Sequence, residues 1–239
     1  DGQTLLITAS STLTVNPWIY TNLAFDPERS FVPVIIPARQ NNILVVHPKH
    51  GVRNLAQFVN LMRANPSRLN YGSAGTGTLS HLASVLFNEQ VQADTVHVGY
   101  SGIAPAMTAL LGGQIDYMFD SATSLPHIKA GKLQALAVLG PARLAAMPEV
   151  PTMRESGYPA MEAAKSWYGI LAPAGTPADT VTKIHKEIFE VLAKPDIEEK
   201  IVTMGMEAAT STPEELAQAI RDGLKKYSQV IKKAGIKPI

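Results

Sequence analysis

Residues 69–86, LNYGSAGTGTLSHLASVL, carry the pattern that decides how this chain is expected to fold. A short strand-like run ends at Gly72, small and hydroxyl residues follow, and an amphipathic helix begins near Ser80. The first turn of a helix has backbone N–H groups without intrahelical partners and carries the positive end of the helix dipole. Glycines also let a ligand approach the backbone. The segment therefore predicts either a small-anion site or an ordinary strand–helix turn capped by Thr76, Thr78 or Ser80.

The same loop lacks the signatures of nucleotide sites. Residues 72–78 have the glycine spacing of a P-loop, but Thr78 stands where the phosphate-binding lysine is required. The dinucleotide fingerprint fails because Ser80 replaces its third glycine. Residues 99–102, GYSG, fall one residue short of the nucleophile elbow of hydrolases. A carboxylate is therefore the expected anion.

Strand-like apolar runs alternate with helical patterns along the whole chain, which predicts an α/β fold with mixed, mostly parallel sheets flanked by helices. Strands are expected at 4–9, 31–37, 42–47, 95–98, 115–119, 133–138 and 167–172, with a short loop at 10–12. Helices are expected at 15–23, 54–65, 80–89, 104–111, 124–130, 178–193, 195–204 and 212–234. The proline-rich segment 141–159 is expected to be a surface loop. Thr212, followed by Pro213 and with Glu215 three residues on, predicts a capped helix start.

Composition excludes several classes of function. The chain has 239 residues, 46% of them hydrophobic and 17% charged, and a formal net charge of +1. This length is enough for a large core or two lobes. Nucleic acid is not expected as a partner, because no basic stripe with interleaved aromatics occurs. No stretch of about 20 apolar residues is present to span a membrane. Cysteine is absent, which excludes disulfides and thiolate metal sites. No metal or other cofactor is expected.

The first residues suggest that the natural chain continues upstream. A turn at residues 1–2 leads directly into a buried-strand pattern, and no signal peptide is visible. We therefore expect this sequence to be an N-terminally truncated piece.

Five motifs in order resemble one family. They are GSAGTGTLSHL (72–82), HVGYSGIAPAMTALLGGQIDYMF (97–119), KAGKLQALAV (129–138), PEVPTMRESGYP (148–159) and WYGILAPAGTP (167–177). Together they resemble the periplasmic solute-binding proteins of tripartite tricarboxylate transporters, the Bug family. Gly99 and Ser101 depart from the pattern, since members usually have Pro and Lys there.

The resemblance implies a two-lobed, type II periplasmic-binding-protein-like fold that closes on its ligand at a hinge cleft. Lobe one would be residues 1–43 and 167–239, lacking an upstream strand and a loop that contacts the ligand, and lobe two would be 44–166. The hinges would lie near 40–44 and 164–168. The implied activity is reversible capture of a small carboxylate, without catalysis. This ligand could be a di- or tricarboxylate, an acidic amino acid or an aromatic acid. A monomer would deliver it in the periplasm to the membrane subunits of a transporter.

By the same resemblance, the hydroxyl and backbone donors of the 73–78 loop would hold one carboxylate end. Other candidates lie at predicted strand ends or beside the loop, and each has a structural alternative. The residues at 10–12 and at 100–102 could close the pocket, or merely cap a helix and form a tight turn. Asp120 could hold an ammonium or hydroxyl of the ligand or cap a helix; Trp167 could line the pocket or only pack; His81 could touch the ligand or be structural. The predicted ligand-binding residues are Ser10, Ser11, Thr12, Ser73, Ala74, Gly75, Thr76, Gly77, Thr78, His81, Tyr100, Ser101, Gly102, Asp120 and Trp167.

Two other functions remain open at this point. A serine hydrolase would use Ser73 or Ser101 as nucleophile, with His97 as the base candidate near Ser101 and Asp94 or Asp116 as the orienting acid. A ligand-loaded receptor for a membrane sensor would have the same sequence features as a transport receptor.

Overall fold

Two units, each with its own sheet, make up the computed structural model, which describes residues 2–164, 166–204 and 206–238. Unit 1 comprises residues 1–40 and 166–239, and unit 2 comprises residues 41–165. The division expected from the sequence changes unit at 43/44 and 166/167. Lys165, inside the expected second hinge, lies outside the described residues.

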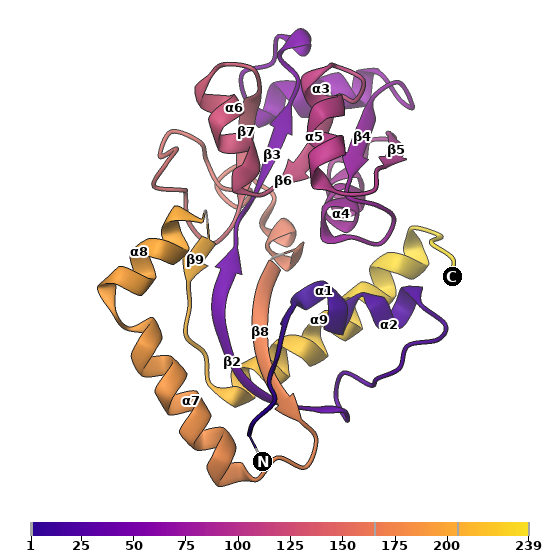
Figure 1. Ribbon diagram of the computed structural model, residues 1–239. Helices are drawn as coiled ribbons and strands as arrows, with labels where there is room; N and C mark the ends of the chain where they lie inside the picture. Colours follow the sequence, from indigo (N-terminus) through magenta and orange to yellow (C-terminus); the bar gives the residue numbers. More distant parts are fainter. Residues whose placement is uncertain (1, 165, 205, 239) are drawn as a thin grey trace. The chain divides into compact units, whose positions relative to one another are not determined.

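The sheet of unit 1 is antiparallel throughout (Figure 1). Its strand order is β1 (Leu6–Ala9), β8 (Ser166–Pro173), β2 (Phe31–Gln40) and β9 (Met206–Ala208). The register between β2 and β8 is irregular on both sides of Ile35, between Pro33 and Ile35 and again before Ala38. Because proline has no N–H to donate, Pro33 and Pro37 account for these interruptions of the ladder.

Alternate residues of β8 face two different cores in unit 1. Trp167 and Leu171 pack with α9 (Pro213–Lys233) and α1 (Ser10–Thr14), whereas Ile170 and Ala172 pack with α7 (Ala178–Leu192). This is the period-two alternation of a strand covered on both faces. Helices α2 (Asn16–Ile19) and α8 (Pro195–Thr203) complete the unit. The predicted capping box at Thr212 and Glu215 is confirmed, with both reciprocal hydrogen bonds formed.

The sheet of unit 2 is mixed. Its order is β5 (Val96–Gly99), β4 (Asn70–Ser73), β6 (Tyr117–Asp120), β3 (Asn42–Val46) and β7 (Gln134–Leu139). Strand β4 runs parallel to β5 and β6, while β3 runs antiparallel to β6 and β7. One face packs against α3 (Leu55–Ala64) and α4 (Leu79–Val91), and the other packs against α5 (Ile103–Leu111). The remaining short helices are α6 (Leu125–Lys129) and the 3-10 turns η1 (Pro48–His50), η2 (Ala122–Ser124) and η3 (Pro159–Ala164).

Three details differ from the sequence-based expectation, although the α/β class is confirmed. Parallel pairing does not dominate: among the described strands only the β4–β5 and β4–β6 ladders are parallel, beside one isolated parallel bridge between Val138 and Thr152. The predicted loop at 10–12 is helical, because α1 begins directly after β1 at Ser10 and is followed by α2, in place of one helix at 15–23. Strand β9 has only three residues and was missed.

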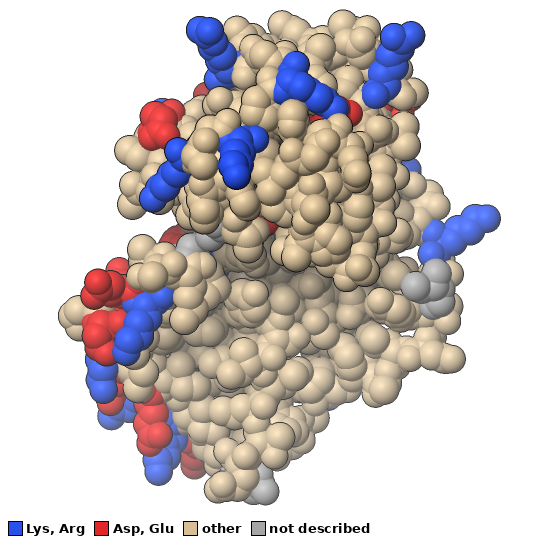
Figure 2. Space-filling view, turned by 45° about the horizontal axis from the view of Figure 1, so that its top comes forward, with Lys and Arg blue, Asp and Glu red and all other residues tan. Residues whose placement is uncertain are grey.

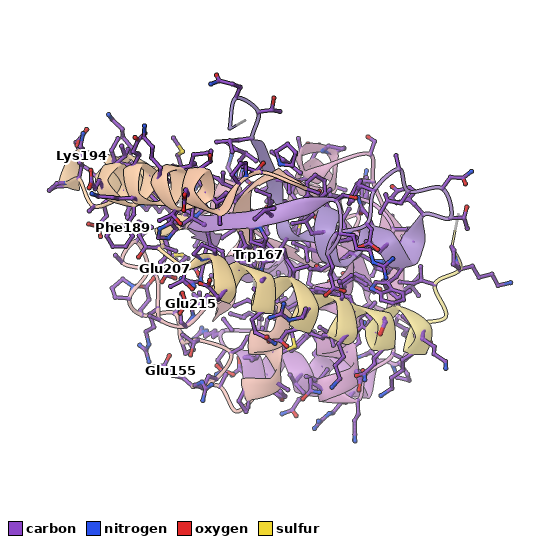
Figure 3. All side chains as sticks on the ribbon, turned by 90° about the horizontal axis from the view of Figure 1, so that it is seen from below. Glu155, Trp167, Phe189, Lys194, Glu207 and Glu215 are labelled. Atoms are coloured by element: carbon purple, nitrogen blue, oxygen red, sulfur yellow. The ribbon has the colours of Figure 1, made fainter. Side chains whose placement is uncertain are left out.

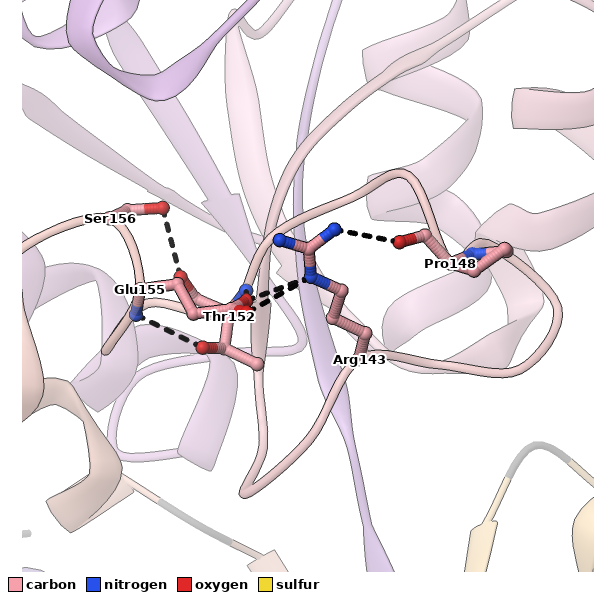
Figure 4. A network of polar contacts seen from close by, with 5 residues as sticks. All are labelled: Arg143, Pro148, Thr152, Glu155 and Ser156. Carbon is pink, nitrogen blue, oxygen red and sulfur yellow. Dashed lines mark hydrogen bonds and ion pairs between the residues drawn. The ribbon is translucent and has the colours of Figure 1, made fainter.

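The proline-rich segment after β7 is more ordered than a plain surface loop. Figure 4 shows Arg143 donating to both carboxylate oxygens of Glu155 at 3.0 and 3.1 Å and to the carbonyl of Pro148 at 2.9 Å. Glu155 in turn accepts the N–H of Thr152 at 2.7 Å. Three apolar side chains of the segment are buried in the cores of unit 2: Met147, Val150 and Met153. Prolines interrupt the apolar pattern here, which explains why the sequence alone indicated an exposed connector.

Charged side chains of both signs are interspersed along the flank of unit 1 that carries α7 and α8 (Figure 2). Two pairs spaced four residues apart, Lys186–Glu190 and Lys200–Asp196, lie on these helices at 3.9 and 3.4 Å. Such exposed pairs contribute little to stability. None of the helices in the described ranges is both long and apolar enough to cross a bilayer.

Candidate ligand-binding site

Three polar segments of unit 2 follow the carboxyl ends of neighbouring parallel strands. Ser73 ends β4, Gly99 ends β5 and Asp120 ends β6. Because these strands are parallel to β4, their carboxyl ends lie at the same edge of the sheet, where ligands of α/β folds usually bind. The structure thus brings together three of the predicted segments: the 73–78 loop, residues 100–102 and Asp120.

The loop from Ser73 to Thr78 requires glycine at two positions. Gly75 has φ +125° and Gly77 has φ +79°, backbone conformations that L side chains rarely adopt. A side chain at Gly75 would also meet the carbonyl oxygen of Tyr100, 3.3 Å from an ideal Cβ. The N–H of Tyr100 donates to the carbonyl of Ser73 at 3.0 Å, so the 73–78 loop and the 100–102 turn are in direct contact.

The hydroxyl of Ser73 is a fully buried junction inside this loop. Its Oγ accepts the N–H of Gly75 at 3.1 Å, lies 3.0 Å from the carbonyl oxygen of Gly75 and lies 2.7 Å from Nε2 of His97. One hydroxyl proton satisfies all three contacts when His97 donates through Nε2–H and Ser73 donates to the carbonyl. We assign that arrangement.

A second chain of hydrogen bonds uses the other hydroxyl protons of the loop. The N–H of Ala74 donates to Ser80 Oγ at 3.1 Å, Ser80 and Thr78 share a contact of 3.1 Å, and Thr78 Oγ1 donates to the carbonyl of Gly75 at 2.7 Å. Because Thr78 donates to the carbonyl, Ser80 is the donor between the two hydroxyls. The hydroxyls of Ser73, Thr78 and Ser80 are therefore engaged within the loop.

Two histidines and a tyrosine form a stack behind the loop. His81, in the first turn of α4, lies 3.9 Å from the His97 ring at 17° between the ring planes. Tyr71 lies 5.0 Å from His97 and 6.1 Å from His81, so each ring is near both of the others. Nδ1 of His81 accepts the N–H of Gly77 at 3.0 Å, so the neutral ring carries its proton on Nε2. Burial, with a smaller contribution from His97, lowers the pKa of His81 to about 4. Burial also lowers the pKa of His97 and raises that of Tyr71 to about 12, so all three rings are neutral at pH 7.

The donors left free at the loop are mainly backbone groups. Within the described part of the chain, no hydrogen-bond partner is present for the N–H groups of residues 79, 80 and 81, as expected for a first helical turn. The hydroxyl and N–H of exposed Thr76 are likewise without a partner among the described residues. These groups are donors, and therefore suit an anion.

The other unit 2 candidates have different surroundings. Gly102 is the N-cap residue of α5, and Ser101 beside it is exposed. Asp120 is buried, and both of its carboxylate oxygens accept from Thr123 Oγ1 at 2.8 Å. Burial raises the pKa of Asp120, while hydrogen bonds from Thr123 and its neighbours act in the opposite direction.

The unit 1 candidates lie near one another. Ser10 is buried, and its Oγ is 3.4 Å from the N–H of Trp167; Ser11 and Thr12 are half-buried on α1. The Trp167 side chain, labelled in Figure 3, belongs to the core between β8 and α9 that also contains Leu216. A side chain on Gly169 would come within 2.9 Å of this indole. The packing role is thus evident for Trp167, while ligand contact stays a prediction for these four residues.

The serine–histidine contact differs from the one the hydrolase alternative considered. His97 hydrogen-bonds Ser73, not Ser101, and the assigned tautomer makes the imidazole the donor, whereas a general base must accept. No carboxylate among the described residues hydrogen-bonds either His81 or His97. Asp116 instead binds Lys49 and His50, at 2.8 and 2.9 Å. In the described ranges no group of three or more His, Asp or Glu could hold a metal ion.

Sequence reasoning missed the contribution of Tyr71 and His97 to this region. Both lie on the same face of neighbouring parallel strands, since Tyr71 pairs with His97 in the β4–β5 register. Aligning these two strands in parallel would have found the pair. The sequence did not determine which strands are neighbours.

A family model described as "Tripartite tricarboxylate transporter family receptor" matches residues 1–236. The chain belongs to this family. It is 36% identical to a UPF0065 protein of Pseudomonas sp. (strain P51), over 97% of this chain and 69% of that relative. The predicted family is therefore confirmed.

Solved structures agree with this assignment. The periplasmic binding protein BugD is 30% identical, with a TM-score of 0.82 over 100% of this chain and 80% of its own. The R. palustris protein Rpa4515, solved with adipate, is 30% identical, with a TM-score of 0.86 over 100% and 80% of the two chains. MatC from Rhodopseudomonas palustris, with bound malate, is 28% identical, with a TM-score of 0.80 over 97% and 80%. The chain is thus a solute-binding receptor of this family, whose members are periplasmic binding proteins, and is not an enzyme.

Proposed function

We propose that this protein captures a small dicarboxylate at the carboxyl edge of β4, β5 and β6. One carboxylate would accept hydrogen bonds from Thr76 and from the N–H groups of the first turn of α4. The observation that carries this proposal is the division of donors in the loop. The N–H groups of residues 74, 75, 77 and 78 are used internally, whereas those of residues 79–81 have no partner among the described residues.

The physics of a helix start supports an anion here. The unpaired N–H groups point out of the first turn, and the macrodipole adds positive potential. Adipate and malate, bound by the two R. palustris proteins, are both dicarboxylates. Malate also carries a hydroxyl, which would donate a hydrogen bond to Asp120. Each carboxylate oxygen of Asp120 has a lone pair left after it accepts from Thr123.

Calorimetric titration at pH 7 with adipate and malate tests the proposal. Thr76→Val keeps the shape of the side chain and removes its hydroxyl, so we expect affinity to fall about 10- to 150-fold for both acids, the value of one hydrogen bond to a charged group. Thr203→Val is the matched control, because Thr203 donates to a carbonyl within α8 of unit 1 and should leave affinity unchanged. If no acid in a panel of small carboxylates binds, the proposal is refuted.

Asp120→Asn separates the two acids. If Asp120 accepts the ligand hydroxyl, this variant weakens malate more than adipate. Equal effects on both ligands would remove Asp120 from the proposed site.

We further propose that the captured acid is delivered, in the periplasm, to the membrane subunits of a tripartite tricarboxylate transporter. The family description supports this role. Uptake of labelled ligand by cells with and without the gene tests it. Unchanged uptake with loss of a ligand-dependent transcriptional response would favour a sensing role.

A further inference from the structure

Building on the proposed function, we propose that His81 is a positioning residue for the ligand loop. Its neutral imidazole would hold Gly77 and the first turn of α4 in the geometry that presents the free N–H groups to a carboxylate. Three features of the His81 ring support this role: its hydrogen bond to Gly77, its packing against His97, and the lack of a carboxylate partner among the described residues.

The hydrogen bond closes the loop onto its own helix. His81 Nδ1 accepts the N–H of Gly77, four residues earlier, at 3.0 Å, and Gly77 has φ +79°. His81 itself is 5% exposed. This bond engages the N–H of Gly77, which is then not available to a ligand. It also fixes the direction of the chain just before residues 79–81, whose N–H groups remain free among the described residues. Without an acceptor at Nδ1, a buried N–H would be left unpaired, and the loop would move to satisfy it.

The ring is held in place by the strands beneath it. His97 stacks on His81 at 3.9 Å, Tyr71 stacks on His97 at 5.0 Å, and Ser73 fixes the edge of His97 at 2.7 Å. The support therefore runs from β4 and β5 to the start of α4. Gly99 assists, since its missing side chain leaves the space between His97 and Gly75.

The arrangement works only when His81 is neutral. Protonation at Nδ1 would turn the acceptor into a donor and break the bond to Gly77. The titratable groups that face His81 are His97 and, at 6.1 Å, Tyr71; beyond them Tyr117 lies 5.6 Å from Tyr71. No carboxylate of the described residues pairs with either imidazole, so nothing there would stabilise the protonated ring. Because burial lowers the pKa of His81 to about 4, ligand affinity should fall as the pH drops through that value.

The test compares two substitutions of one residue. His81→Asn keeps an acceptor near the position of Nδ1 and cannot be protonated there, whereas His81→Leu fills similar space without an acceptor. With adipate and malate at pH 7, we expect His81→Leu to bind at least tenfold more weakly and His81→Asn to remain within about threefold of the native protein. His127→Leu, a histidine substitution in α6, is the control and should change affinity less than twofold.

A pH series distinguishes positioning from general loss of stability. Protonation of the ligand affects all proteins alike, so the ratio of native to His81→Asn dissociation constants isolates the ring. This ratio should rise about twofold between pH 7 and pH 4, where half of the His81 rings are protonated. A constant ratio, or a His81→Asn protein as weak as His81→Leu, would overturn the inference.

Amide exchange at Gly77 gives a readout that needs no ligand. The amide should be protected in the native and His81→Asn proteins and exchange freely in folded His81→Leu. Equal protection in all three contradicts the positioning role, even if no acid binds. If His81→Leu fails to fold, the pH series with His81→Asn alone decides. Absence of binding with the protection pattern intact would refute the proposed function and leave the positioning role standing.

Discussion

Removing the hydroxyl of Ser73 is the perturbation for which the structure gives the sharpest magnitude. Ser73→Ala deletes an atom that accepts the N–H of Gly75 and the Nε2–H of His97 and donates to the Gly75 carbonyl. The residue is 0% exposed, so water cannot replace these contacts without rearrangement. Each of the two donors left unpaired costs about 1–3 kcal/mol. We therefore expect unit 2 to lose about 2–6 kcal/mol of unfolding free energy.

Ser84→Ala is the matched control. Ser84 is also 0% exposed, and its hydroxyl donates to the carbonyl of Ser80 within α4 at 3.0 Å. Because this partner is a carbonyl of the helix ladder, removing the hydroxyl leaves no donor unpaired among the described residues. The same atom is deleted from the same residue type, and the expected loss is below about 1 kcal/mol.

The assay must report on unit 2. Both tryptophans, Trp18 and Trp167, belong to unit 1, so their fluorescence follows the wrong unit. Native-state amide exchange in β4 and α4 measures the local and global opening free energies directly. Equal losses for Ser73→Ala and Ser84→Ala, within about 0.5 kcal/mol, would refute the view that Ser73 is a junction of the loop.

Three further predictions concern packing, charge and capping. Gly72→Ala should destabilise unit 2 by about 1–3 kcal/mol, because an ideal Cβ lies 2.2 Å from Cδ1 of Ile115; adding Ile115→Val should restore part of the loss in urea unfolding. Asp116→Asn should lower the urea midpoint at pH 7, and the difference should vanish as the pH falls below about 4. Burial raises the pKa of Asp116, but hydrogen bonds from Lys49 and other donors outweigh it, so the net pKa is lowered. The stabilisation is therefore fully present above the pKa of an unfolded aspartate, about 4, and is lost as the pH falls through the lower pKa of the folded protein. Thr212→Ala should lower the unfolding free energy of unit 1 by about 1 kcal/mol, read from tryptophan fluorescence; an unchanged value would contradict the capping role.

Features set by neighbours in sequence were predictable. The helix start at Thr212 needed only the chemistry of four consecutive residues, and β8 was expected at 167–172 and found at Ser166–Pro173. The loop at 72–78 was expected between a strand and a helix, and its glycines do adopt positive φ at two positions. Local propensity and hydrophobic period determine such elements.

Features that depend on which strands pair were not predictable from one sequence. The antiparallel contact of β2 with β8 joins residues about 130 positions apart, such as Arg39 and Trp167, and alternation of strands with helices wrongly indicated mostly parallel sheets. The same limit hid the hydrogen bond between Ser73 and His97, which depends on β4 lying beside β5. The sequence predicted candidate site residues, but it could not show which of their donors already hydrogen-bond within the loop.

These hydrogen bonds within the loop change how the proposed site would bind an anion. The loop looks rich in hydroxyl donors, yet the hydroxyls of Ser73, Thr78 and Ser80 hold the loop itself. The imidazoles behind it are neutral at pH 7, so they add no positive charge. Attraction of a carboxylate would then rest on backbone N–H groups and the helix dipole, which act over one turn of the helix. Since long-range ionic attraction is what salt screens most, raising the salt concentration from 0.05 to 0.5 M should weaken carboxylate binding by no more than about threefold. A site in which a lysine or arginine supplied the attraction would lose far more.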